Sequence, residues 1–91
     1  MTAIVDAGQH VLGIYTDGDL RRTLEKRLDF STTPVRSVMS ANPHCIGPDA
    51  LAAEAVQVME QYNISQMLVV DEQHKLVGAL NMHDLLHAKV I

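Results

Sequence analysis

The sequence predicts an α/β protein made of two copies of one supersecondary unit. The segment 3–24 recurs at 68–89 with a constant offset of 65 residues, which aligns Gly13 with Gly78 and Asp19 with Asp84. Apolar residues form 47% of the chain and aromatic residues only 3%, so the core must be aliphatic. Short strand patterns alternate with helical patterns. Such an internal repeat predicts two units that bury their apolar faces against each other, with the function between them.

Each expected element follows from a local pattern. Aliphatic runs separated by turn residues predict hairpins, and apolar residues three and four apart predict amphipathic helices. In the first helix Leu20, Leu24 and Leu28 share one face. Because the first copy lacks the opening β-α that would cover Leu20 and Leu24, we expect these two residues to belong to an apolar surface through which the chain self-associates. In chain order the patterns predict strands at 2–6 and 11–15, a helix at 17–27, a linker at 28–34, a strand at 44–46, a helix at 50–62, strands at 67–70 and 75–80, and a helix at 82–89.

The second half of the chain carries the complete unit, β-α-β-β-α, and the first copy lacks the opening β-α. Pro48-Asp49 predicts the N-cap of the second helix. The buried stripe predicted for that helix consists of Leu51, Ala55, Val58, Met59 and Tyr62. The expected organisation is a partial first repeat at 1–30, a linker at 31–36 and a second repeat at 37–91. Because the chain begins within a strand pattern, we expect it to be a fragment.

The composition excludes several classes of protein. The net charge of −4 argues against a nucleic-acid or anionic-membrane partner, since both favour a basic surface. Cys45 is the only cysteine, so no intrachain disulfide can form, and a reducing cytoplasm is the expected compartment. No apolar run approaches the roughly 20 residues that span a bilayer. We expect a cytoplasmic protein.

Two motif copies carry a family resemblance. They read Gly-h-x-x-x-x-Asp, with h an apolar residue, at 13–19 and 78–84, and a Val-Met-x-x-x-Pro pattern lies at 38–43. A hairpin followed by this motif and a helix, in tandem, resembles the cystathionine-β-synthase (CBS) domain pair, a small regulatory module. The resemblance implies two small sheets of about three strands in a pseudo-twofold arrangement. The amino-acid sequences of segments 16–22 and 82–86 resemble the C-terminal CBS pair of bacterial arabinose 5-phosphate isomerases. These enzymes belong to lipopolysaccharide precursor synthesis.

The resemblance implies a regulatory function and a site. In CBS pairs a nucleotide-like ligand lies between the repeats, with its ribose on the motif aspartate and its phosphate on a hydroxyl or arginine. The implied effector is an adenine nucleotide or CMP-Kdo. The implied partners are an N-terminal sugar-isomerase domain and other copies of the chain. No catalytic residue, metal or cofactor is expected. The residues expected to bind the ligand are Thr16, Asp19, Arg21, Ile46, Met67, Leu68, Asn81 and Asp84.

Several of these residues have a second interpretation. Thr16 and Asp19 form the pattern of a capping box, which Asn81 and Asp84 reproduce without the hydroxyl. The basic residues of the first helix could clamp a phosphate or form a solvated face, and the solvated face is favoured. Met67 is interpreted as core rather than as a contact to a base, and two histidines four apart, His83 and His87, make a weak metal site. The rival function is an oligomerisation scaffold that binds no ligand.

Overall fold

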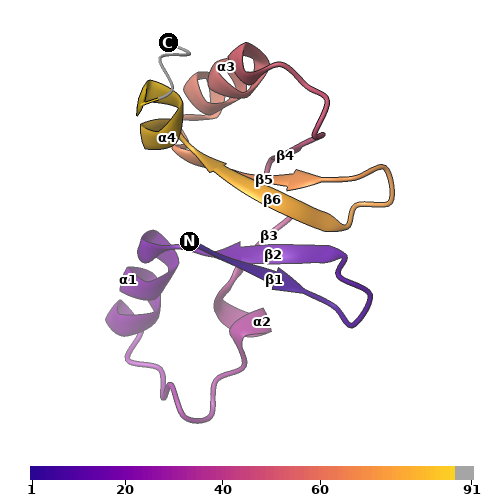
Figure 1. Ribbon diagram of the computed structural model, residues 1–91. Coiled ribbons are helices and arrows are strands. Elements are labelled where there is room, and N and C mark those ends of the chain that lie inside the picture. Colours follow the sequence, from indigo (N-terminus) through magenta and orange to yellow (C-terminus); the bar gives the residue numbers. More distant parts are fainter. Residues whose placement is uncertain (88–91) are drawn as a thin grey trace. The chain divides into compact units, whose positions relative to one another are not determined.

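The computed structural model describes residues 1–87. It contains two compact units, one ending at Pro43 and the next beginning at His44. Each unit holds a three-stranded sheet with helices, as the sequence predicts (Figure 1). The first unit comprises β1 (Thr2–Val5), β2 (Val11–Tyr15), α1 (Asp17–Glu25), α2 (Val35–Val38) and β3 (Ser40–Ala41). The second comprises β4 (Cys45–Ile46), α3 (Ala52–Tyr62), β5 (Gln66–Val70), β6 (Leu76–Asn81) and α4 (Met82–His87). The predicted last helix extends to residue 89, and its end lies outside the described residues.

The hairpins repeat in atomic detail. In the first turn the Asp6 carboxylate accepts hydrogen bonds from the backbone N–H groups of Gly8 and His10, each at 2.9 Å. In the second turn Asp71 accepts from the residues two and four positions later, at 2.9 and 3.0 Å. Both turns place a residue with positive φ at the same position, Gln9 at 70° and His74 at 64°. The strand register also shifts at equivalent places in both hairpins, so the repeat is structural as well as sequential.

The third strand joins each sheet differently. In the first unit β3 pairs antiparallel with β2, placing Ser40 opposite Ile14. In the second unit β4 pairs parallel with β5, the counterpart of β1, on the other side of the hairpin. Residues 35–41 therefore belong to the first compact unit, although they resemble the entry to the second repeat. The repeat boundaries at 1–30 and 37–91 describe sequence repetition and remain a prediction.

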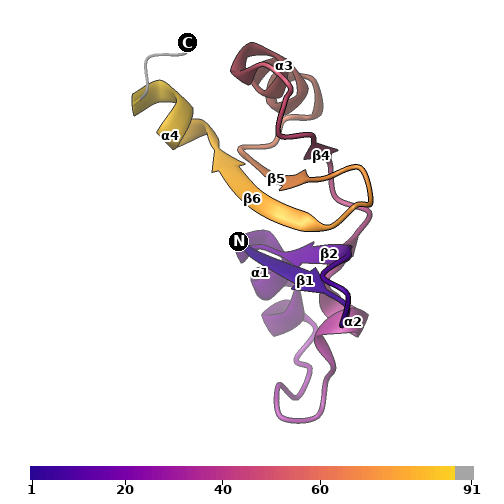
Figure 2. The ribbon, with the colours of Figure 1, turned by 45° about the vertical axis from the view of Figure 1, so that its right-hand side comes forward.

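The apolar core within the described residues is centred in the second unit, where α3 and α4 lie on one face of the sheet (Figures 1 and 2). Its fully buried members are Ala55, Val56, Met59, Met67 and Leu85. Residues 52–62 supply three of them from α3, and Met67 comes from the central strand β5. Because the side chains are aliphatic, the core agrees with the predicted composition. Of the buried stripe predicted for α3, Ala55 and Met59 are buried and Val58 packs against the core, whereas Leu51 and Tyr62 are exposed.

The start of α3 differs from the prediction. The N-cap is Leu51, which makes no side-chain cap hydrogen bond, and the predicted cap at Pro48-Asp49 is wrong. Residues 47–50 instead form a turn closed by a hydrogen bond from Ala50 N to Gly47 O at 3.2 Å. Leu51, at the N-cap, is 67% exposed, and Tyr62, the last residue of the helix, is 49% exposed. Val56 takes their place on the buried face.

The buried face of α1 is polar, and the leucine face lies exposed, as expected for Leu20 and Leu24. Leu20, Leu24 and Leu28 are 41%, 56% and 37% exposed, whereas Asp19 and Thr23 are each 2% exposed. The hydroxyl of Tyr15 in β2 lies 2.8 Å from that of Thr23, and Ser40 at the start of β3 donates to Asp19. These hydrogen bonds orient the polar face toward the sheet and leave the leucines outward. No helix among residues 1–87 is long and apolar enough to cross a membrane.

Candidate functional site

The first motif copy is a closed hydrogen-bonded structure. Thr16 is the N-cap of α1, and its hydroxyl accepts a hydrogen bond from Asp19 N at 3.2 Å. Asp19 Oδ2 in turn accepts from Thr16 N at 2.8 Å and from Thr16 Oγ1 at 3.0 Å. Asp19 Oδ1 accepts from Ser40 Oγ at 2.7 Å and from Arg22. The carboxylate therefore receives four hydrogen bonds, which occupy the roughly four lone-pair sites available to it.

Electrostatics holds Asp19 in its charged form. Burial would raise its pKa, but the hydrogen bonds from Ser40, Thr16 and Arg22 outweigh burial and keep the pKa below the ordinary value of 3.8. The ionised carboxylate thus joins α1 to the chain segment that enters β3. This arrangement supports the capping-box interpretation and adds two donors, Arg22 and Ser40, that the sequence analysis did not assign.

The second motif copy is open. Asn81 at the end of β6 accepts a hydrogen bond from Asp84 N at 2.8 Å, which reproduces one half of the capping box. The Asp84 side chain is exposed, and its carboxylate makes no hydrogen bond or ion pair within residues 1–87. A carboxylate in this state can accept hydrogen bonds from two hydroxyl groups of a ligand.

The other predicted ligand residues occupy diverse environments. Arg21 lies exposed on α1 and does not line the hollow described below. Ile46 in β4 is half-buried, whereas Met67 and Leu68 in β5 are 1% and 2% exposed. Met67 belongs to the core, as predicted from the sequence. Its side chain is therefore not accessible to a ligand, and only its backbone could contact one. Strand pairing brings Leu68 opposite Cys45 and Gln66 opposite Asn81, so the predicted positions of the second unit lie on neighbouring strands.

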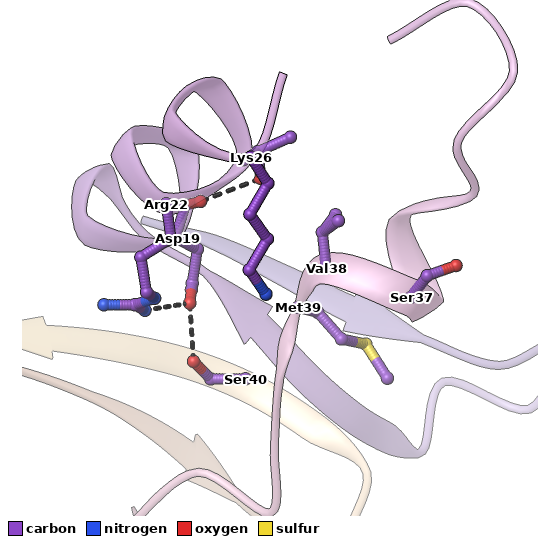
Figure 3. A pocket seen from close by; sticks show the side chains of 8 residues that line it. Asp19, Arg22, Lys26, Ser37, Val38, Met39 and Ser40 are labelled. Atoms are coloured by element: carbon purple, nitrogen blue, oxygen red, sulfur yellow. Dashed lines mark hydrogen bonds and ion pairs between the residues drawn. The ribbon is translucent and has the colours of Figure 1, made fainter. Parts of the chain in front are cut away.

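A polar hollow of about 220 Å³ lies within the first unit, between α1 and the α2–β3 segment (Figure 3). Asp19 and Arg22 meet at its wall, and the Lys26 side chain runs alongside toward Met39 (Figure 3). The Ser37 hydroxyl points away from this group (Figure 3). The lining residues are Asp19, Arg22, Thr23, Lys26, Ser37, Val38, Met39 and Ser40. Of the predicted ligand residues, the hollow contains Asp19 alone.

A second hollow, of about 180 Å³, lies within the second unit and is mostly apolar. It lies between α3 and the strands and includes Ile46 from the predicted set. Its lining residues are Ile46, Gly47, Pro48, Ala50, Leu51, Ala52, Ala55, Val69 and Leu80. Its lining contains no charged residue and suits an apolar group rather than a charged one.

Comparison with known proteins identifies the family. The model of the CBS domain matches residues 35–91, more than half of the chain. The chain belongs to the CBS domain family. Among solved CBS structures, the CBS domain pair of protein MJ0100 in complex with 5′-methylthioadenosine and S-adenosyl-L-methionine is 25% identical, with a TM-score of 0.84 over 96% of this chain and 70% of that one.

Two further proteins extend the comparison. The cytosolic domain of the Mg²⁺ channel MgtE in complex with ATP is 26% identical, with a TM-score of 0.78 over 94% of this chain and 32% of that one. The arabinose 5-phosphate isomerase KdsD of Pseudomonas aeruginosa is 43% identical over the whole of this chain. The chain spans 25% to 28% of the length of this isomerase and two further ones. These findings confirm the predicted CBS resemblance and its link to the isomerases.

Cys45 and the histidine pair His83 and His87 are the other candidate reactive groups of this CBS protein. Burial raises the pKa of the Cys45 thiol, which disfavours the reactive thiolate. His83 and His87 contact each other edge to face with ring centroids 4.7 Å apart. Within the part of the chain that is described, no three His, Cys, Asp or Glu side chains gather as a metal site would require.

Proposed function

We propose that this chain is the effector-binding regulatory module of an arabinose 5-phosphate isomerase of the cytoplasm, in the route to lipopolysaccharide. The isomerases that resemble it over its whole length support this parent enzyme. The sugar-isomerase domain would precede the chain and carry out the reaction. The effector would be a nucleotide or nucleotide sugar, either an adenine nucleotide or CMP-Kdo.

The open carboxylate of Asp84 is the observation that carries the binding role. It is exposed and unpaired within residues 1–87, at the position where the CBS resemblance expects the ribose contact. The adenosine-derived ligands of MJ0100 and the ATP of MgtE support a nucleotide. A ligand that binds one arrangement of the module more tightly than another shifts the population of the attached enzyme. Asn81 in place of a hydroxyl residue lowers the expected affinity for phosphate.

A thermal-shift titration with AMP, ATP, CMP and CMP-Kdo tests this role. At 100 times its dissociation constant a ligand stabilises the folded state by roughly 2.7 kcal/mol. For a domain of this size that raises the unfolding midpoint by roughly 10–20 °C. Asp84→Asn should abolish the response, whereas Glu72→Gln, which removes the same charge from an exposed turn, should preserve it. An unchanged wild-type midpoint with all four compounds, in the chain and in the full-length isomerase, would exclude the proposed effectors.

A second candidate function is oligomerisation, with no ligand. The exposed apolar side chains of the first unit favour it, since such patches commonly mark interfaces. They are Leu20, Leu24, Leu28, Phe30 and Val35. Sedimentation of the chain across a range of concentrations tests it. A monomeric mass at every concentration would contradict oligomerisation through these side chains.

A further inference from the structure

The exposed face of α4 carries two histidines side by side. Leu85 anchors the helix, because it is 6% exposed and belongs to the core of the second unit. His83 and His87 each lie two residues from Leu85, about 200° around an α-helix, so both lie on the opposite face. Both residues are exposed. Residues four apart are neighbours on a helix surface, and the two imidazole ring centroids lie 4.7 Å apart.

The ring nitrogens of this pair are not engaged elsewhere within residues 1–87. Neither ring makes a hydrogen bond or an ion pair there, and the two rings contact each other edge to face. Other histidines are differently placed, since His10 Nδ1 lies 3.1 Å from the Asp6 carboxylate and His44 stacks on Tyr62. A neutral imidazole has one nitrogen lone pair, so the pair on α4 offers two to a ligand.

The charge beside the pair is negative. The described part of α4 contains Asp84 and no lysine or arginine. Asp84 adjoins His83 and precedes His87 by three residues, which makes it a neighbour of His87 on the helix surface. Its carboxylate is exposed and has no partner within residues 1–87. A cation bound to the two imidazoles would therefore meet a favourable charge.

We propose that His83 and His87 chelate a divalent transition-metal ion of the class of Zn²⁺, Ni²⁺ and Cu²⁺. Imidazole nitrogen suits these ions, and two histidines four apart on one helix face are the spacing used in zinc-binding helices. Once one imidazole binds, the second is held close to the ion, so the pair binds more tightly than a single histidine.

The proposed site is open rather than closed. Among residues 1–87 no third His, Cys, Asp or Glu gathers with the pair, so water fills the remaining coordination positions. Closed structural zinc sites take four protein ligands, whereas open sites keep at least one position for water. The spacing alone makes this pair a weak site. The structure adds that both rings are exposed, in contact and without other partners among the described residues.

This site is separate from the proposed effector contact. It uses the two imidazoles, whereas the effector contact is the carboxylate of Asp84. A bound ion would connect successive turns of α4 and place positive charge next to Asp84. A metal titration without nucleotide therefore tests the site whether or not the chain senses an effector.

Titration of the ¹⁵N-labelled chain with zinc chloride, followed by NMR of the imidazole nitrogens, tests the site. The chain contains five histidines, so the other three serve as internal controls. We expect saturable shifts of His83 and His87 with one ion per chain, reversed by EDTA. Shifts that rise linearly with concentration, that spread equally over all five histidines, or that centre on Cys45 would overturn the proposal.

Variants test chelation itself. His83→Gln and His87→Gln should each weaken the affinity at least about tenfold, which corresponds to ~1.4 kcal/mol. The double variant should bind little more weakly than either single one, because a lone imidazole no longer chelates. His74→Gln is the matched control and should preserve the affinity. It removes another exposed histidine of the second unit, at a position with positive φ where the first hairpin holds Gln9.

The pattern of these affinities decides the proposal. Equal effects of the three single variants, or losses that simply add in the double variant, would overturn chelation by the pair. All three histidines are exposed, so each replacement should leave the fold intact. If one variant fails to fold, the imidazole shifts of the wild-type chain decide the same question.

Discussion

The two motif copies share a sequence pattern but differ in what their aspartates do. Asp19 is buried and accepts hydrogen bonds from Thr16, Arg22 and Ser40. Asp84, at the equivalent position 65 residues later, is exposed, and its carboxylate has no partner within the described chain. One copy of the motif has become part of the fold, whereas the other keeps a carboxylate available for a ligand.

The difference originates partly inside the motif, where Thr16 donates two hydrogen bonds to Asp19 and Asn81 takes the place of that hydroxyl residue, and partly outside it. Ser40 reaches Asp19 because β3 pairs with β2 in the first unit, and the third strand of the second unit pairs on the opposite side of its hairpin. Within residues 1–87, Asp84 therefore meets no hydroxyl equivalent to that of Ser40. The hydrogen bonding of a motif aspartate thus depends on which strand lies beside it, and the motif alone does not determine that hydrogen bonding.

The largest expected effect is on stability, when each aspartate is replaced by alanine. Asp19→Ala removes a buried acceptor of four hydrogen bonds and should cost about 2–4 kcal/mol of unfolding free energy. Asp84→Ala removes an exposed group and should cost less than about 1 kcal/mol, chiefly through the lost charge near the start of α4. Urea unfolding of both variants measures the difference. Equal costs would contradict the contrast between the two copies.

Alanine at the two equivalent glycines, Gly13 and Gly78, should also change the stability by different amounts. A methyl group at Gly13 would lie 2.6 Å from Ser40 O and 2.8 Å from Met39 Sδ, whereas at Gly78 its nearest neighbour is Val69 Cβ at 3.7 Å. The backbone oxygen of β3 cannot yield easily, so Gly13→Ala should destabilise the protein by about 1–3 kcal/mol. Gly78→Ala should change the stability by less than about 1 kcal/mol. Thermal unfolding of the two variants checks this, and tolerance at both positions would show that β3 does not pack as described.

The pH dependence of stability should report the hydrogen bonds that Asp19 accepts. The folded-state pKa of Asp19 is lowered from 3.8. Its stabilisation is therefore fully present well above pH 3.8 and is lost as the pH falls through the folded-state pKa. Asp19→Asn should flatten the decline of the unfolding midpoint between pH 5 and pH 3. Asp6 and Asp29 also have lowered pKa values and contribute to the part of the decline that remains in this variant. If the unfolding midpoint of Asp19→Asn fell with pH as steeply as that of the wild type, a group other than Asp19 would cause the loss of stability in acid.

The sequence predicted features whose causes are local. Both hairpins depend on an aspartate that binds amides two and four residues later, and turn chemistry of this kind is visible in a few letters. The capping box at Thr16 and Asp19 is equally local. The Asp19–Ser40 hydrogen bond joins residues 21 apart through a strand pairing that no periodicity encodes. The hollow at Arg22 and Lys26 depends on the same pairing, so it could not be predicted.

The smallest expected effect concerns the leucine stripe of α1. Leucines four apart form the apolar face of an amphipathic helix, and truncation of a buried leucine costs about 2–5 kcal/mol. Leu24 is 56% exposed, because hydrogen bonds from Tyr15 to Thr23 and from Ser40 to Asp19 turn the polar face of α1 toward the sheet. Leu24→Gln should therefore change the free energy of unfolding of the monomer by less than about 0.5 kcal/mol. Urea unfolding at low protein concentration gives this value, and repetition at high concentration shows whether the leucine is covered in an oligomer. A cost above about 2 kcal/mol at low concentration would mean that the leucine face is buried within one chain.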